Sequence, residues 1–318
     1  MVSALTRDTY DPGDTTFSVT QLIDSPRIGI LQQGHDSDIE RDVVDFLWSR
    51  FGTSMHNMFE DAVEGDQYIT EERLFYETQG CKSPGAIDLH EKTPEGLIIR
   101  DYKVTSAWSV IYGKSEWETQ LNAYEWLVRH VKNVPVAAVE IVAILRDWNR
   151  RSAETKADYP QSPIQIIRIS RWTEAEQDAY MDERIRLHTE AEKSFFMGDP
   201  LPLCSDEERW MKPTKYALKK GKNIRALKIF DTMEAAQQSL ETKDDSHHIQ
   251  ERPGEFTRCE QDWCRVSQWC DQFRGKECSI TTVRRWIRSW GSGSKTKYLA
   301  STFALKTKPW CVSGEHGS

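Results

Sequence analysis

The sequence predicts an α/β protein with a mixed central sheet of four to five strands and helices on both faces. Apolar runs of strand length at residues 97–103 and 139–145 alternate with longer amphipathic runs, such as residues 116–132. The second observation is size: 318 residues with 38% hydrophobic side chains are enough to bury a substantial core. The third is the absence of any apolar run near the roughly 20 residues that a membrane span needs.

The first sixty residues predict helices after a polar start. Residues 1–16 are polar and acidic and are expected to be disordered, with no signal peptide. A short helix is expected from Ser18 to Leu22. Residues 37–50 place apolar side chains at helical spacing. Gly52 interrupts that pattern, so a second helix is predicted over residues 54–63.

The middle of the chain predicts the sheet. Residues 73–77, 86–90, 97–103, 139–145 and 164–169 are expected to form strands. The second and third of these should pair through residues 91–96, which contain Pro94 and Gly96. The fourth is apolar throughout, as in a strand buried on both faces. Helices are predicted over residues 116–132 and 172–196, the latter opened by the capping pair Thr173 and Glu176.

Three short motifs carry the chemistry. Gly85-Ala86-Ile87-Asp88 ends an apolar stretch, Asp101-Tyr102-Lys103 lies thirteen residues later, and the next helix carries Gln120 and Tyr124. Phosphodiester hydrolysis needs an activated water and relief of negative charge, and Mg²⁺ held by carboxylates supplies both. Asp88 and Asp101 on neighbouring strands are therefore candidate ligands of one ion.

Other groups complete the candidate site. Lys103 lies on the same strand face as Asp101 and could orient the water or stabilise the developing anion. The Tyr102 backbone carbonyl and the His56 imidazole are further candidate ligands, and histidine would add tolerance of Mn²⁺. Gln120 and Tyr124 share a helix face and could bind a phosphate or hold Lys103 in place. Taken singly, each of these residues is more often a structural or surface residue.

The ordered set resembles the PD-(D/E)XK nuclease superfamily, and within it the RecB-like exonuclease branch. Residues 17–274 carry the resemblance, and the residues on its motif positions are His56, Asp88, Asp101, Lys103, Gln120 and Tyr124. The resemblance implies a restriction-endonuclease-like core, metal binding and catalysis by the first four, and exonuclease activity on DNA. It extends to the CRISPR-associated and phage members of the branch.

The cysteines suggest a second metal site. Seven cysteines in a chain expected in a reducing compartment favour metal ligation or free thiols over disulfides. Cys259, Cys264 and Cys270 are closely spaced, and Cys204 is the candidate fourth ligand, with Cys81 as its alternative. Members of the resembling branch carry a [4Fe–4S] cluster there, although their closing spacing is Cys-x2-Cys-x5-Cys and this chain has x4 and x5. The alternatives are Zn²⁺ and free thiols.

Basic residues suggest where nucleic acid binds. The net charge is −8, but residues 209–230 contain eight basic residues and no acidic one between Arg209 and Lys228. The candidates for phosphate contact are Lys215, Lys219, Lys220, Lys222 and Arg225. The alternative is an ordinary solvated surface. A short helix is expected within residues 233–240.

These observations predict a divalent-metal-dependent DNA nuclease, an exonuclease by resemblance, acting in recombination, repair or phage DNA metabolism. The alternatives are an endonuclease with the same site and a catalytically inactive DNA-binding subunit. Expected partners are single- or double-stranded DNA and a helicase or recombination protein, in the cytoplasm of a bacterium or phage-infected cell, with no membrane. The expected organisation is a disordered 1–16, a nuclease core over 17–200, a basic and cysteine-containing segment packing on it over 201–274, and an irregular tail over 275–318.

Overall fold

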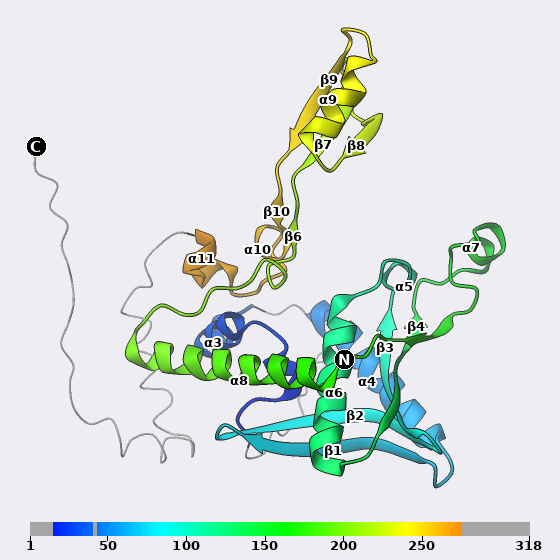
Figure 1. Cartoon of the computed structure of the whole chain (residues 1–318), viewed down its shortest axis with the longest axis vertical. Coiled ribbons are helices and arrows are strands. Elements are labelled where there is room, and N and C mark those ends of the chain that lie inside the picture. Colours follow the sequence, from blue (N-terminus) through cyan, green and yellow to red (C-terminus); the bar gives the residue numbers. More distant parts are fainter. Residues whose placement is uncertain (1–14, 41–42, 275–318) are drawn as a thin grey trace, which may run out of the picture.

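The predicted α/β class is confirmed by a five-stranded mixed sheet with helices against both faces (Figure 1). The structure is a computed structural model that describes residues 15–40 and 43–274. Most of the expected N-terminal disorder and the expected irregular tail lie outside the described residues. The strands are β1 (Tyr68–Thr78), β2 (Cys81–Thr93), β3 (Gly96–Thr105), β4 (Val136–Leu145) and β5 (Ile164–Arg168).

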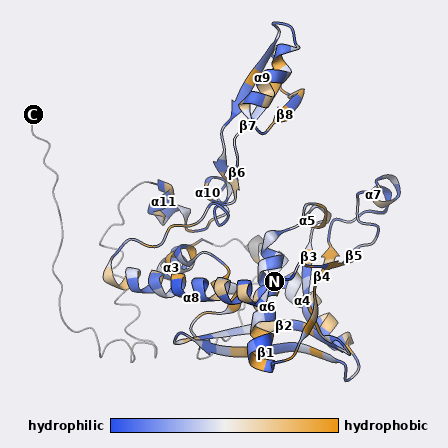
Figure 2. Cartoon of the chain, in the orientation of Figure 1, coloured by the Kyte–Doolittle hydropathy of each residue, from blue (hydrophilic) through white to orange (hydrophobic). Residues whose placement is uncertain are grey.

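The strands lie in sequence order, and only one neighbouring pair is parallel. β1, β2 and β3 form an antiparallel meander, β3 and β4 run parallel, and β5 returns antiparallel to β4. The parallel pair requires a crossover, which is supplied by α5 (Ala107–Tyr112) and α6 (Ser115–Lys132). Figure 2 shows the hydrophobic character of β4, the fourth strand of the sheet, which is buried on both faces as its apolar run predicts.

Each face of the sheet has its own helix layer. Helix α6 covers one face with the main core, where Leu121 and Leu127 are fully buried with Ile87, Ile99 and Ile141. Helix α8 (Glu174–Met197) packs beside α6, and its predicted capping box of Thr173 and Glu176 is present. On the other face, α4 (Val43–Ala62) lies over a smaller cluster formed by Leu89, Tyr102 and Val142.

Gly85 lets two helices approach β2 closely. A Cβ atom built at Gly85 would lie 2.7 Å from a Leu127 methyl, 3.3 Å from the Tyr124 ring and 3.3 Å from a Val19 methyl. Val19 belongs to α2 (Val19–Leu22), the short helix expected after Ser18, which caps it. The glycine of the Gly-Ala-Ile-Asp motif is therefore a packing residue that seats α6, and with it Tyr124, against the strand.

The prediction of two helices separated at Gly52 was wrong. A single helix, α4, runs from Val43 to Ala62 and contains Gly52 in its interior. A helix-interior glycine costs only about 1 kcal/mol relative to alanine, which is too little by itself to end a helix of 20 residues. A further helix, α3 (Pro26–His35), was not predicted; Pro26 at its first position fits a helix start.

The segment after α8 divides into a small lobe and a return to the core. The basic lobe, residues 211–256, contains a three-stranded sheet ordered β8 (Lys228–Phe230), β7 (Lys215–Lys220) and β9 (His247–Arg252). Helix α9 (Met233–Glu241), near its predicted position, packs on this sheet. A two-stranded stem of β6 (Met211–Lys212) and β10 (Glu255–Phe256) connects the lobe, which projects from the rest of the molecule (Figure 1).

After the lobe, the chain returns to α3 through short helices, α10 (Thr257–Glu260), η1 (Ser267–Trp269) and α11 (Asp271–Arg274). Two ion pairs connect this segment to the N-terminal part of the chain: Arg27 with Asp271, and Arg258 with Asp24 at 2.9 Å. Within the described ranges, no helix is long and apolar enough to span a membrane.

Candidate active site and cysteine pocket

The candidate active site forms where β2 and β3 separate. Their backbone pairing runs from Thr93–Gly96 to Leu89–Arg100 and stops there. Beyond that pair, a side chain replaces the backbone as hydrogen-bond acceptor: the Asp88 Oδ2 accepts a hydrogen bond from the Tyr102 amide at 2.7 Å. The side chain thus satisfies a strand amide that no longer pairs with the backbone of β2.

Asp101 is held by two partners from its own sheet face. Its Oδ2 lies 2.7 Å from Lys103 Nζ, and its Oδ1 accepts a hydrogen bond from Gln120 Nε2 at 3.0 Å. Gln120 also donates to the Tyr124 hydroxyl at 3.0 Å. The structure therefore places Gln120 against Asp101 rather than against Lys103. It brings together four side chains of the second and third motifs: Asp101, Lys103, Gln120 and Tyr124.

His56 reaches the site from α4 on the other face. Its Nε2 donates to the Tyr102 carbonyl at 3.0 Å, and its Nδ1 lies 3.6 Å from Asp88 Oδ1. A hydrogen bond that fixes one ring nitrogen as the donor leaves the other with its lone pair free for a metal. The Tyr102 carbonyl is thus engaged in orienting His56, and its predicted role as a ligand stays a prediction.

Glu71 belongs to this site and was not predicted. Thr70 pairs with Leu89 and Glu72 with Ile87, so Glu71 stands opposite Asp88. Its backbone adopts φ 47°, and its Oε1 lies 3.9 Å from His56 Nδ1. By contrast, the next residue, Glu72, binds Lys132 at 2.6 Å and so takes no part in the site.

The sequence does contain a signal for Glu71. Gln79 and Gly80 both have positive φ and form the two-residue turn between Thr78 and Cys81. A two-residue hairpin turn fixes the register of both strands, and counting back from it sets Glu71 opposite Asp88.

Three donors of the site are close enough to hold one metal ion. The ligand atoms of His56, Glu71 and Asp88 all lie within 4.8 Å of one another, and no other such His, Cys, Asp or Glu group occurs among the described residues. Two carboxylates and one imidazole suit a divalent cation such as Mg²⁺ or Mn²⁺. Asp101, predicted to share this ion with Asp88, is outside the trio and faces Lys103.

The electrostatics of the site favour a cation. Burial, with Asp101 nearby, raises the pKa of Asp88 to about 8. Burial also raises the pKa of Glu71 above its usual range. Desolvation raises the pKa of Tyr124, which keeps its hydroxyl protonated. Closely placed carboxylates with raised pKa values repel one another, and a divalent cation between them would relieve that repulsion.

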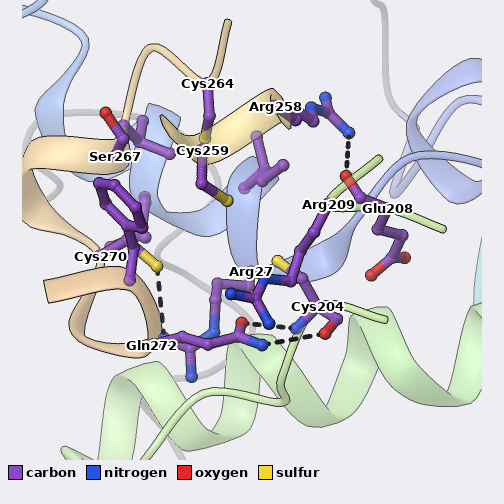
Figure 3. Close-up of a pocket in the computed structure, with 14 residues that line it drawn as sticks. Arg27, Cys204, Glu208, Arg209, Arg258, Cys259, Cys264, Ser267, Cys270 and Gln272 are labelled. Carbon is purple, nitrogen blue, oxygen red and sulfur yellow. Dashed lines mark hydrogen bonds between the residues drawn. The ribbon is translucent and has the colours of Figure 1, made fainter. Parts of the chain in front are cut away.

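The four candidate cysteine ligands line one pocket. Cys204, Cys259, Cys264 and Cys270 surround it together with buried Arg27 (Figure 3). Cys204 is thereby placed with the three closely spaced cysteines, whereas Cys81, its alternative, lies in the main core. Burial raises the pKa of Cys204 to about 11 and that of Cys264 above its usual value, so these thiols are protonated unless a metal binds them.

The pocket also gathers positive charge. Arg27, Arg209 and Arg258 all line it. Arg27 donates to the carbonyls of Pro202 and Leu201 at 2.9 and 2.6 Å, and its guanidinium lies 4.0 Å from the Cys270 sulfur. Guanidinium groups beside four cysteines would stabilise the anionic charge of a metal–thiolate centre.

The spacing of the sulfurs bears on the kind of metal. Zinc with four sulfur ligands at about 2.3 Å brings those sulfurs to roughly 3.8 Å from one another. No three of these four described sulfurs lie within 4.8 Å of each other. In the structure, which holds no metal, the sulfurs are therefore spaced more widely than in a closed zinc site.

The five candidate DNA-binding residues lie on the basic lobe. Lys215 and Lys219 are on β7, Lys220 ends it, and Lys222 and Arg225 follow in the turn before β8. Lys215 pairs with Asp231, whereas Lys220, Lys222 and Arg225 are exposed. The structure thus gathers them on one lobe, apart from the strands that carry Asp88 and Asp101 (Figure 1).

Comparison with known proteins gives distant likenesses of fold. No protein-family model matches the chain, and no curated protein matches its sequence. The crystal structure of SSO0001 is 17% identical, with a TM-score of 0.41, over 56% of this chain and 79% of that one. A putative exonuclease from Eubacterium rectale is 13% identical, with a TM-score of 0.24, over 53% of this chain and 65% of that one. Both TM-scores are below 0.5, so these likenesses carry no functional argument.

Proposed function

We propose that this protein is a divalent-metal-dependent nuclease that hydrolyses phosphodiester bonds of DNA. The observation that carries the proposal is the pairing of two groups across the β2–β3 gap. On one side, His56, Glu71 and Asp88 form a set of metal donors. On the other, Lys103 is held by Asp101 at 2.7 Å and remains partly exposed. Metal donors beside an accessible ammonium suit attack on a phosphate.

Each residue has a role in this proposal. His56, Glu71 and Asp88 hold the cation, which when bound supplies positive charge to a phosphate oxygen and lowers the pKa of a water. Lys103 orients the water or stabilises the negative charge that develops on the phosphate. Asp101 fixes the Lys103 ammonium, and Gln120 fixes Asp101 in turn. Tyr124, hydrogen-bonded to Gln120, completes this chain of contacts.

The test compares Lys103→Ala with parent protein on end-labelled DNA in Mg²⁺ or Mn²⁺. Linear single strands, linear duplexes and closed circles are supplied separately. We expect the parent to degrade linear DNA and the variant to be slower by at least about a hundredfold, because an electrostatic group near the reacting phosphate contributes on that scale. Lys92→Ala, on the same sheet and bound to the Asp66 carbonyl at 2.9 Å, is the matched control.

The outcomes separate the alternatives. Degradation of linear DNA only makes the protein an exonuclease, the activity that we favour, acting in recombination, repair or phage DNA metabolism with a helicase or recombination partner. Cleavage of circles makes it an endonuclease. Bound but uncut DNA in every condition would leave a catalytically inactive binding subunit and overturn the proposal.

We further propose that the basic lobe binds the DNA backbone and that the cysteine pocket holds a metal centre. Exposed Lys220, Lys222 and Arg225 provide positive charge on a chain of net charge −8. Four cysteines that line one pocket with arginine neighbours suit a [4Fe–4S] cluster or Zn²⁺.

A further inference from the structure

Helix α4 extends its inward-facing side beyond the sheet. Phe59 stacks on Tyr102, with ring centroids 4.7 Å apart, and His56 reaches the Tyr102 carbonyl. Eight residues before His56, about 12 Å along the helix, Trp48 is 51% exposed. Phe51, one turn after Trp48, is 43% exposed, and the two rings meet edge to face at 6.3 Å. Helix α4 therefore packs against the sheet near Phe59 and presents partly exposed aromatic rings near Trp48.

A second aromatic pair follows the strand that bears Lys103. Trp108 and Tyr112 lie one turn apart on α5, are 52% and 79% exposed, and stack with an interplanar angle of 13°. Helix α5 begins at Ala107, two residues after β3 ends. These rings are thus near the end of the strand toward which Lys103 lies.

Arg146 and its neighbour link both pairs to the same end of the sheet. The Arg146 guanidinium lies 4.5 Å from the centroid of the Trp48 ring, and its backbone amide donates to the Thr105 carbonyl at 2.9 Å. The next residue, Asp147, accepts a hydrogen bond from the Ala107 amide at 2.7 Å. Trp48 with Phe51, and Trp108 with Tyr112, therefore border the ends of β3 and β4, where Lys103 is two residues from the strand end.

We propose that Trp48, Phe51, Trp108 and Tyr112 stack against unpaired bases of the substrate, so that DNA enters this site as a single strand; this rests on the proposed nuclease function. Exposed aromatic rings with cations beside them are the features that hold single-stranded nucleic acid, because every base offers a flat face and every nucleotide a phosphate. Arg146, which lies over the Trp48 ring, supplies such a cation. The bases of a duplex are stacked on one another and cannot use these rings.

The experiment measures binding without cleavage, with divalent metal removed by EDTA. The probes are a short oligo-deoxythymidine and an abasic strand of the same length and charge. We expect the oligonucleotide with bases to bind roughly tenfold more tightly, since a stacked base contributes on that scale. Trp48→Leu and Trp108→Leu should each lose most of this preference, while Trp48→Phe and Trp108→Phe should keep it. Trp263→Leu, another exposed tryptophan on the C-terminal segment, is the matched control.

The outcomes distinguish this inference from the proposed function. Equal binding of both strands, or an unchanged preference in the leucine variants, would overturn the stacking role and would point to a protein partner on these rings. If the parent protein still degrades DNA, the nuclease proposal survives that result. If DNA is neither bound nor cut, both proposals fail together.

Discussion

At the scale of the residue, the site depends on side chains that replace regular backbone contacts. Asp88 accepts the hydrogen bond of the Tyr102 amide, and His56 donates to the carbonyl of the same residue. The sequence identified Asp88, Asp101, Lys103 and His56 as candidates because their order matched a known motif. It did not identify Glu71, because that position depends on a hairpin register set by the turn at residues 79–80.

The raised pKa of Asp88 predicts an unusual stability profile. The unfolded carboxyl titrates near 3.8 and the folded one near 8, so the folded chain holds an extra proton between these values. Metal-free protein should therefore become less stable as pH rises through this window. Asparagine cannot ionise and can still accept the Tyr102 hydrogen bond, so Asp88→Asn should melt higher than the parent at pH 8, by about 3 °C or more.

Thermal melts in EDTA check this prediction. The difference in melting temperature between the parent and Asp88→Asn should be smaller at pH 5 than at pH 8. Mg²⁺ or Mn²⁺ should raise the melting temperature of the parent and leave that of Asp88→Asn unchanged. An Asp88→Asn variant that is less stable than the parent at pH 8 would contradict the assignment of a strained buried carboxylate.

At the scale of the element, most helices and strands followed from local patterns, and the exceptions have physical causes. The strand with a continuous apolar run, the capped helix α8 and the helix α6 were all predicted. Helix α4 was divided in error, because Gly52 was taken to end a helix although a glycine inside a helix costs only about 1 kcal/mol. The sheet of the basic lobe was not predicted, since its strands are short and rich in lysine.

The uninterrupted helix α4 can be tested at Gly52. A Cβ atom added there meets nothing within 4 Å, so alanine fits without a clash. Gly52→Ala should stabilise the protein by about 0.5–1 kcal/mol, because it removes the cost of a helix-interior glycine. Urea unfolding measures the change. Gly80→Ala is the control and should destabilise, because Gly80 has φ 71°; a less stable Gly52→Ala variant would mean that the helix is broken there.

The cysteine pocket predicts a metal that ties Cys204, which follows α8, to the three cysteines of the C-terminal segment. Cys264→Ser should release the bound metal and lower the melting temperature, since Cys264 is buried against Ile28 and Leu31 of α3. Elemental analysis and visible absorption of anaerobically purified protein give the metal content. Cys81→Ala, in the main core, should keep the metal. If the parent protein is colourless and contains stoichiometric zinc, the site is a zinc site and not an iron–sulfur cluster. If the parent contains no metal, the cysteines are free thiols.

At the scale of the whole molecule, the lysines proposed to bind DNA are separated from the candidate metal site. The acidic side chains that suit a metal lie in the sheet, whereas exposed lysines lie on the projecting lobe (Figure 1). The basic run over residues 209–230 indicated the position of these lysines from the sequence alone. How the two regions are arranged depends on interactions between distant segments, such as Arg27 with Asp271, which local patterns do not encode.

This arrangement predicts the salt dependence of DNA binding. Lys220→Gln with Lys222→Gln should weaken binding and reduce the slope of log affinity against log salt by up to about 0.9 for each phosphate that is no longer neutralised. Fluorescence anisotropy at several salt concentrations measures the slope. Lys92→Gln with Lys193→Gln removes the same charge from exposed positions outside the lobe. Equal slopes for both double variants would make the lobe an ordinary solvated surface.

The hydrogen bond from the Tyr102 amide to Asp88 makes that amide a natural reporter of occupancy. Its partner is a carboxylate oxygen rather than a strand carbonyl, so any cation that draws electron density from Asp88 must weaken this bond. Titration with a diamagnetic divalent ion would then move the amide resonance of Tyr102 in step with binding. The break in the sheet thus gives a spectroscopic readout of the metal site that needs neither DNA nor turnover.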